Sequence, residues 1–252
     1  MKNANELFAA LLELADDHLV LGHRLSEWCG HAPSLEEDLA LPNLALDLLG
    51  TARELYASAG AIEGRGRCED SLVFFRDERE FRNCLLVERP NGDFACTVLR
   101  QFYFSTFMKE YWRRAKMSAS ETIRGIAGRA ANEASYHARY ASEWTIRLGD
   151  GTRESRSRMD AAACELYRFT GELFLSSDAA SACERDDLLP NRAAIRNEWL
   201  EASSRIIEAA GLDFPKEEFF LEGGRQGKHS ECLGHLLAEM QYLQRSHPGA
   251  KW

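Results

Sequence analysis

The chain has 252 residues, of which 45% are hydrophobic and 28% charged, as is ordinary for a globular protein. Its formal net charge of −9 disfavours a broad electrostatic attraction to nucleic acid or to an anionic membrane surface. The seven cysteines are scattered, no secretory signal precedes them and no apolar run approaches the roughly 20 residues of a membrane span, so we expect a cytoplasmic protein with free thiols.

The hydrophobic pattern predicts helices from the start of the chain. Apolar residues recur at steps of three and four from Leu7 to Trp28, which marks one face of a long helix. The sequence GHAP at 30–33 ends this helix, because proline cannot continue it. A second helix is expected from about Ser34, and leucines around much of its circumference indicate burial on several sides. Pro42 either lies near the start of this helix or kinks it.

Two connections precede a third long helix. Residues 60–72 are rich in glycine and charge, and 88–93 (ERPNGD) form a tight connection with Asp93 as a helix N-cap. The stretch between them has no clear period and is expected to hold short helices. The third helix, 94–117, has more large apolar residues than one core can bury, so we expect part of it to face outward as an interface patch. The residues concerned are Phe102, Tyr103, Phe104, Phe107, Met108, Tyr111 and Trp112.

A fourth long helix is expected from a Ser118 or Ser120 cap to Leu148. Its apolar stripe is rich in alanine, which would let a neighbouring helix approach closely. The sequence GDGT then breaks the chain, and further helices are expected to about Ser176, across 190–210 and across 230–245. With no strand pattern and no internal repeat, the sequence predicts one all-α domain, 1–252, in which a helical bundle is followed by additional C-terminal helices.

The sequence NEASYHARY at 132–140 raises the question of a metal site. Glu133, His137 and Tyr140 share one face of the fourth helix, where they could ligate a metal or form a hydrogen-bonded network. A two-iron bundle needs about six inward ligands, including two Glu-x-x-His pairs. This segment has Glu-x-x-x-His instead, and the residue three before each of the seven histidines is never Asp or Glu.

The second helix does not supply the missing ligands either. Asp47 is followed three residues later by Gly50, and a helical wheel places Asp47 on the polar arc, away from the leucines. The pattern therefore argues against an intact dinuclear site, and we assign no catalytic, cofactor-binding or metal-binding residue. Glu133 and His137 are expected to form a buried structural pair, and the isolated chain is expected to bind no stoichiometric iron.

Weaker signals are interpreted structurally. His18, flanked by Asp16 and Asp17, is expected to be a satisfied core histidine. The spacing of His23, Cys29 and His31 is too irregular for zinc, and the set His229, Cys232 and His235 gives little support for a metal site. GGRQGK at 223–228 lacks the spacing of a phosphate loop and is interpreted as a flexible loop. The arginine runs Arg76/Arg79/Arg82 and Arg153/Arg156/Arg158 could hold a small anion, but solvated, ion-paired faces are favoured.

Long segments of the chain resemble the C subunits of the phenylacetyl-CoA epoxidase family (ring 1,2-epoxidase, or phenylacetate-CoA oxygenase). The segments are LGHRLSEWCGHAPSLEEDLALPNLALDLLG at 21–50, FRDEREFRNCLLVERPNGDFA at 75–95, EASYHARY at 133–140, RFTGELF at 168–174, GGRQGKHSECLGHLLAEMQYLQR at 223–245 and the final PGAKW. They follow one another over nearly the whole chain, which is far more specific than a short motif.

The resemblance implies a ferritin-like helical fold and a place in a multicomponent bacterial monooxygenase of phenylacetate catabolism. In that family the homologous catalytic A subunit carries the di-iron site, the small B subunit bridges the assembly, and a reductase with FAD and a 2Fe-2S cluster delivers electrons from NADPH. The C subunit is the structural partner and carries no cofactor of its own. A homodimer of the isolated chain is left open.

Two functions from different classes follow from the sequence. The favoured one is a structural, non-catalytic subunit of the oxygenase complex, with the metal site of its fold lost. The alternative is a metal-binding oxidase in its own right, with an atypical centre built on Glu133 and His137 and with Asp16 as a further candidate.

Overall fold

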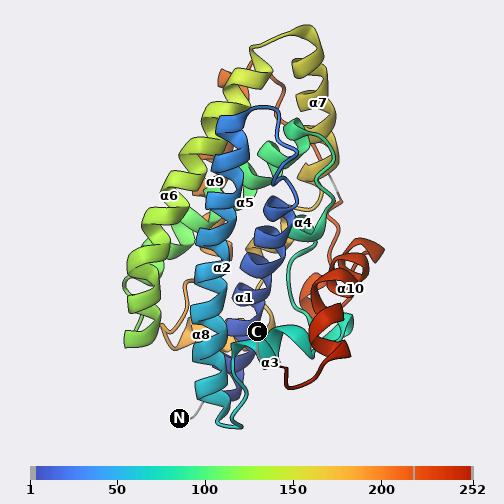
Figure 1. Ribbon diagram of the computed structural model, residues 1–252. Coiled ribbons are helices and arrows are strands. Elements are labelled where there is room, and N and C mark those ends of the chain that lie inside the picture. The colour runs from blue at the N-terminus through green and yellow to red at the C-terminus, as the bar shows by residue number, and fades with distance from the viewer. Residues whose placement is uncertain (1–3, 218, 251–252) are drawn as a thin grey trace.

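The computed structural model describes residues 4–217 and 219–250, and the regular elements in these residues are all helical. Four long helices form the central bundle: α1 (Ala4–Ser26), α2 (Leu35–Glu63), α5 (Phe94–Ala115) and α6 (Glu121–Gly149). Helix α1 packs along α2, and α5 packs along α6 (Figure 1). The predicted all-α ferritin-like bundle with additional C-terminal helices is confirmed.

The ends of the long helices follow the sequence signals closely. The side chains of Ser34, Asp93 and Ser120 accept hydrogen bonds from backbone N–H groups in the first turns of α2, α5 and α6. Helix α2 continues through Pro42 and ends at Gly64, whose φ of 68° is the left-handed conformation typical of glycine at a helix end.

Helix α5 lies in the middle of the molecule. It packs against α6, α4 (Leu85–Glu88), α7 (Arg153–Tyr167) and α9 (Arg196–Ala209). The prediction of an outward apolar patch on this helix is therefore wrong, because all seven candidate residues are buried. They are Phe102, Tyr103, Phe104, Phe107, Met108, Tyr111 and Trp112. Exposed leucines lie instead on α2, at Leu35, Leu39 and Leu46.

The connection between α2 and α5 forms short helical elements, as expected. They are α3 (Glu69–Phe74), the 3-10 turn η1 (Glu78–Glu80) and α4. Because α2, α4 and α8 (Asp178–Arg185) all pack on α1, that helix is buried almost all round.

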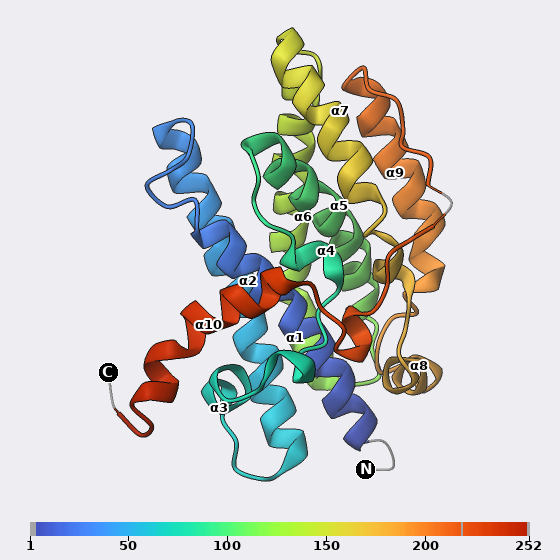
Figure 2. The ribbon, with the colours of Figure 1, turned by 90° about the vertical axis from the view of Figure 1, so that its right-hand side faces the viewer.

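The C-terminal third differs most from the expectation. The helix predicted to reach Ser176 ends at Tyr167 and is followed by the turn η2 (Gly171–Phe174). Gly171 lies so close to Phe220 that a Cβ would collide with its side chain, so tertiary packing fixes this irregular segment. Helix α8 was not predicted. The last helix, α10 (Glu231–Ser246), lies outside the bundle against α3 and η1 (Figure 2).

Candidate functional site: a small cavity between the four central helices

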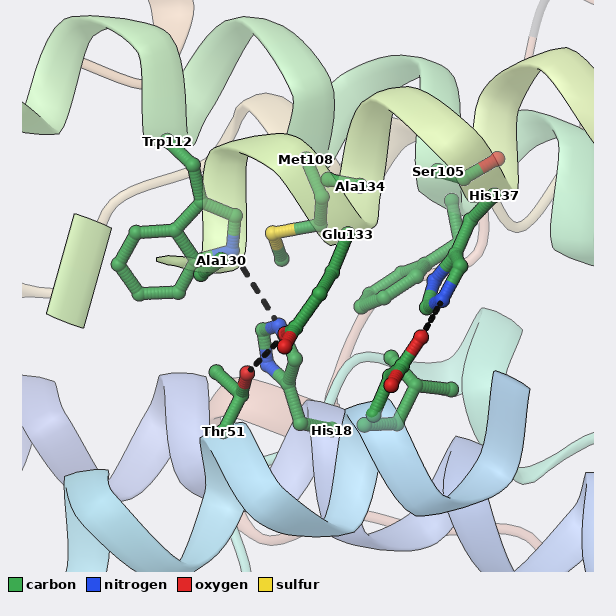
Figure 3. Close-up of a pocket in the computed structure, with 12 residues that line it drawn as sticks. His18, Thr51, Ser105, Met108, Trp112, Ala130, Glu133, Ala134 and His137 are labelled. Carbon is green, nitrogen blue, oxygen red and sulfur yellow. Dashed lines mark hydrogen bonds and ion pairs between the residues drawn. The ribbon is translucent and has the colours of Figure 1, made fainter. Parts of the chain in front are cut away.

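A small cavity lies where the four central helices face one another. Its volume is about 10 Å³, which is roughly the space of one water molecule. All four helices contribute to its wall, and α6 and α2 supply the acidic side chains (Figure 3). The lining residues are His18, Asp47, Leu48, Thr51, Phe104, Ser105, Met108, Trp112, Ala130, Glu133, Ala134 and His137.

His137 pairs with Asp47 across the gap between α6 and α2. The distance from His137 Nε2 to Asp47 Oδ2 is 3.0 Å, and the histidine side chain is only 3% exposed. The expectation that Asp47 lies on a polar arc away from the site is therefore wrong. Helix α2 packs against α1 on one side and α6 on another, so a residue at the boundary of its apolar face can still reach a neighbouring helix.

Glu133 does not pair with His137, which corrects the expectation of a Glu133–His137 pair. Its carboxylate accepts a hydrogen bond from Thr51 Oγ1 at 3.3 Å and forms an ion pair with Arg129 Nε at 3.1 Å. Burial, with the nearby charge of Asp47, raises the pKa of Glu133 above its ordinary value. Glu133 and His137 therefore each bind other residues, and not each other as the sequence suggested.

Tyr140 is also directed elsewhere. Its hydroxyl donates a hydrogen bond to the Glu37 carboxylate in the first turn of α2, and neither residue lines the cavity. Burial and this carboxylate both raise the pKa of the Tyr140 phenol. The three polar residues of the fourth helix therefore contact three different residues of α2, namely Asp47, Thr51 and Glu37, and do not converge on one point.

His18 is a satisfied core histidine, as predicted. Its Nδ1 donates to the Leu14 carbonyl oxygen at 2.7 Å, and its Nε2 accepts from the indole N–H of Trp112 at 3.4 Å (Figure 3). Burial lowers its pKa to about 4. The ring is therefore neutral near pH 7, and the one lone pair that could bind a metal is already engaged.

Asp16 lies away from the cavity. It precedes His18 by two positions along α1, which corresponds to about 200° of helical rotation. Its carboxylate accepts hydrogen bonds from the hydroxyl of Tyr56, the guanidinium of Arg76 and the backbone N–H of Arg82. The atypical centre of Glu133, His137 and Asp16 is therefore not assembled.

The donor set of the cavity does not fit a di-iron site. Helix α5 supplies Ser105, Met108 and Trp112 where a carboxylate would be needed, and α6 supplies Ala130 and Ala134 beside its acid. Within residues 4–217 and 219–250, no group of three or more His, Cys, Asp or Glu side chains could hold a metal ion. The polar side chains of the wall are instead bound to one another or to neighbouring residues.

A second buried polar cluster was missed by the sequence reasoning. Glu13, Asp16 and Asp17 of α1 are each at most 2% exposed. Their partners are Arg192 at 3.5 Å, the guanidinium of Arg76, and Arg225 at 2.7 Å. The sequence feature that could have indicated this cluster is the group of three acids in a helix whose other residues are mostly apolar.

These ion pairs correct two interpretations. Arg76 belongs to the arginine run that was favoured as a solvated face, but it is buried. Arg225 lies in the GGRQGK segment that was interpreted as a flexible loop, yet it is 3% exposed and donates to Asp17, to the Glu13 carbonyl and to the Arg82 carbonyl. The segment is fixed because a buried carboxylate requires its cation.

His229 likewise has a structural partner. Its Nδ1 lies 2.7 Å from Glu88 Oε2, and it does not share a site with Cys232 and His235. All seven cysteines are free thiols. No helix in the described part of the chain is both long and apolar enough to cross a bilayer.

Two comparisons relate the chain to known proteins. A model of the family "Phenylacetic acid catabolic protein" matches residues 1–252. The chain is 44% identical over 248 residues to the C subunit of the 1,2-phenylacetyl-CoA epoxidase of Escherichia coli strain K12, a match that covers 98% of this chain and 100% of that relative.

Proposed function

The chain belongs to the phenylacetic acid catabolic protein family, and we propose that it is the structural, non-catalytic subunit of a phenylacetyl-CoA epoxidase. In this role it supports a homologous di-iron subunit that epoxidises the aromatic ring of phenylacetyl-CoA. A small bridging subunit and a reductase that carries electrons from NADPH through FAD and a 2Fe-2S cluster complete the assembly. The family and the named relative support the pathway; the role within the complex is our inference.

The observation that supports a non-catalytic role is the wall of the central cavity. The bundle keeps the arrangement in which four helices could direct ligands inward, but α5 contributes no acid and His18 is engaged by Trp112. Asp47 and His137 bind each other across the same space. A cavity of about 10 Å³ also leaves no room for an aromatic substrate beside a metal.

The alternative, an oxidase with its own metal centre, would have to rely on Asp47, Glu133 and His137. These are two carboxylates and one imidazole, each already bound to another protein group. A metal would have to displace the Asp47–His137 contact and would then keep several water ligands. We therefore prefer the partner role.

Two measurements test the proposal together. The chain should be purified from iron-supplemented cells, and its metal content measured by mass spectrometry; we expect far less than one iron per chain. Phenylacetyl-CoA turnover should then be measured with the catalytic subunit, the bridging subunit and the reductase, with and without this chain. We expect turnover to depend on its presence.

A variant at His137 distinguishes a supporting role from a catalytic one. His137→Ala removes the imidazole on which such a metal centre would depend, so an oxidase centred there would lose its turnover, whereas a supporting subunit would retain it as long as the fold persists. About two irons per chain, or full turnover in the absence of this chain, would refute the partner role.

A further inference from the structure

The segment that leads into α10 is attached to the bundle by two buried cations. The first is Arg225, which binds Asp17 with both terminal nitrogens at 3.0 and 2.7 Å. The second is His229, four residues later, whose side chain has no exposed area. Beyond it, α10 packs on α3 and η1 and projects away from the four central helices (Figure 2).

Both ring nitrogens of His229 face oxygen acceptors. Nδ1 lies 2.7 Å from the Glu88 carboxylate, and Nε2 lies 3.0 Å from the carbonyl oxygen of Phe81. A neutral imidazole has one donor and one acceptor nitrogen, so it can satisfy only one of these contacts. With Glu88 ionised, both contacts are hydrogen bonds only when the ring is doubly protonated, so the geometry favours an imidazolium in the folded protein.

The Glu88 carboxylate is fully engaged in the same arrangement. Oε1 accepts from the backbone N–H of Ser230 at 2.7 Å, and Oε2 also accepts from Asn83 Nδ2 at 2.9 Å. Because both Glu88 and His229 side chains are fully buried, loss of the charge on one would leave the other charged and unpaired.

The surrounding charges favour the cation. Asp16 on α1 adds a second negative charge, while Arg24 on the same helix donates to the backbone carbonyls of Glu88 and Cys232. Arg76 and Arg225 nearby are each bound to their own aspartate. Burial alone would lower the pKa of His229, but Glu88, the Phe81 carbonyl and Asp16 together raise it above the ordinary value of 6.5.

We propose that His229, Glu88 and the Phe81 carbonyl form a proton-dependent latch that holds the start of α10 to the bundle and releases it as the pH rises. On deprotonation the proton leaves for solvent, and one ring nitrogen then presents a lone pair to an oxygen acceptor, which is repulsive. The first turns of α10 open as a result, and Leu233, Leu236 and Leu237 lose their cover.

The release is local. On the upstream side, Arg225 keeps its ion pair with Asp17, since an arginine does not titrate in this range. On the downstream side, Gln241 donates to the carbonyls of Val73 and Arg76, and Arg245 donates to Phe74 and Asp77. The part that opens therefore lies between these anchors, from His229 to about Leu237, and its opening also breaks the hydrogen bond from Arg24 to the Cys232 carbonyl.

The sign of the pH dependence follows from the raised pKa. The latch contributes fully below the unfolded value of 6.5 and is lost as the pH rises through the folded value. Between those two values the opening equilibrium should increase about tenfold for each pH unit.

The test uses the intact chain and two readouts. Nitrogen-15 NMR of the imidazoles should show His229 doubly protonated near pH 6.5, with a pKa above the ordinary value of 6.5. Hydrogen exchange of the amides of residues 231–237, corrected for the intrinsic base dependence, should lose protection from about pH 6 to about pH 9. The amides of α5 should keep their protection over the same range.

Two variants, one at His229 and one at an exposed histidine of α10, test whether the pH dependence comes from His229. His229→Gln removes the titrating ring, so protection of residues 231–237 should be low and independent of pH. His235→Ala, a change on the exposed face of the same helix, should behave as the wild type. A neutral His229 near pH 6.5, or equal wild-type protection at both pH values, would overturn the proposal. Because these two readouts need only the wild-type chain, the decision stands even if His229→Gln fails to fold.

Discussion

Asp17 and Arg225 show at the residue scale why a polar interior is stable here. The two side chains are 0% and 1% exposed, and the aspartate also accepts from the backbone N–H of Cys84. Removing one member leaves the other as an unpaired charge in the core, so Arg225→Ala should lower the free energy of unfolding by about 3–5 kcal/mol. Urea denaturation measures this loss.

The matched control for that change is Arg158→Ala. Arg158 is 53% exposed and pairs with the exposed Glu154, so its removal should cost far less than the loss of the buried pair. Equal losses for the two variants would show that the buried pair contributes no more than a surface pair.

The rearranged contacts of Glu133 give a second residue-scale prediction. Because Glu133 binds Thr51 and a half-exposed Arg129, Glu133→Ala should cost about 1 kcal/mol, less than a buried charged pair would lose. A double-mutant cycle should show little coupling between Glu133 and His137 but a coupling of about 0.5–3 kcal/mol between Asp47 and His137. A larger coupling for Glu133 than for Asp47 would contradict the contacts described above.

His18 predicts a pH dependence of stability in the acidic range. Its folded pKa of about 4 lies below the ordinary 6.5, so the unfolded chain binds the proton more readily between these values. Stability due to His18 is therefore complete above about pH 6.5 and falls as the pH decreases, by about 2 kcal/mol at pH 5. His18→Gln should remove this part of the slope in urea titrations at several pH values. An unchanged slope would mean that His18 is not buried as a neutral ring.

At the element scale, the segment 223–230 depends on glycine for close approach. A Cβ on Gly224 would collide with the carbonyl oxygen of Asn83, and the same segment donates two backbone N–H groups to Glu172. Gly224→Ala should therefore destabilise the protein by about 1–3 kcal/mol, since the backbone must shift. Thermal unfolding of the purified variant measures the effect.

A glycine in helix α6 provides the matched control, for which we expect the opposite change in stability. Gly128 lies inside the helix, and a Cβ there would meet open space. Gly128→Ala should stabilise the protein by about 0.5–1 kcal/mol, because alanine loses less backbone entropy in a helix. If both variants changed the stability in the same direction, the packing of the segment 223–230 would not be the cause.

At the scale of the whole molecule, the C-terminal helices are joined to the bundle by buried polar contacts. Glu13 of α1 pairs with Arg192, Asp17 pairs with Arg225, and the indole of Trp199 in α9 donates to the Tyr103 carbonyl in α5. We therefore expect residues 1–252 to unfold as one domain. Circular dichroism and tryptophan fluorescence should give the same midpoint in urea. Two separate transitions would instead divide the chain into a bundle and a C-terminal unit.

Local signals in the sequence were enough to predict the long helices and where they begin. Residues three and four apart lie on one face of a helix, and a cap needs only its own first turn, so neither signal depends on the rest of the fold. For that reason Ser34, Asp93 and Ser120 could be assigned, and the absence of Glu-x-x-His pairs could be counted, from the residues alone. His18 as a satisfied core residue follows from the same periodicity.

Which residues of different helices meet could be learned only from the packed fold. Asp47 reaches His137 because of how α2 is rotated against α6, and Arg225 reaches Asp17 because the segment 223–230 packs on α1. Both depend on contacts between segments far apart in the chain. The aromatic residues of α5 were expected to exceed what one core could bury, but α7 and α9 also pack on this helix. Periodicity shows that a face is apolar, whereas what lies against that face is set by the tertiary packing.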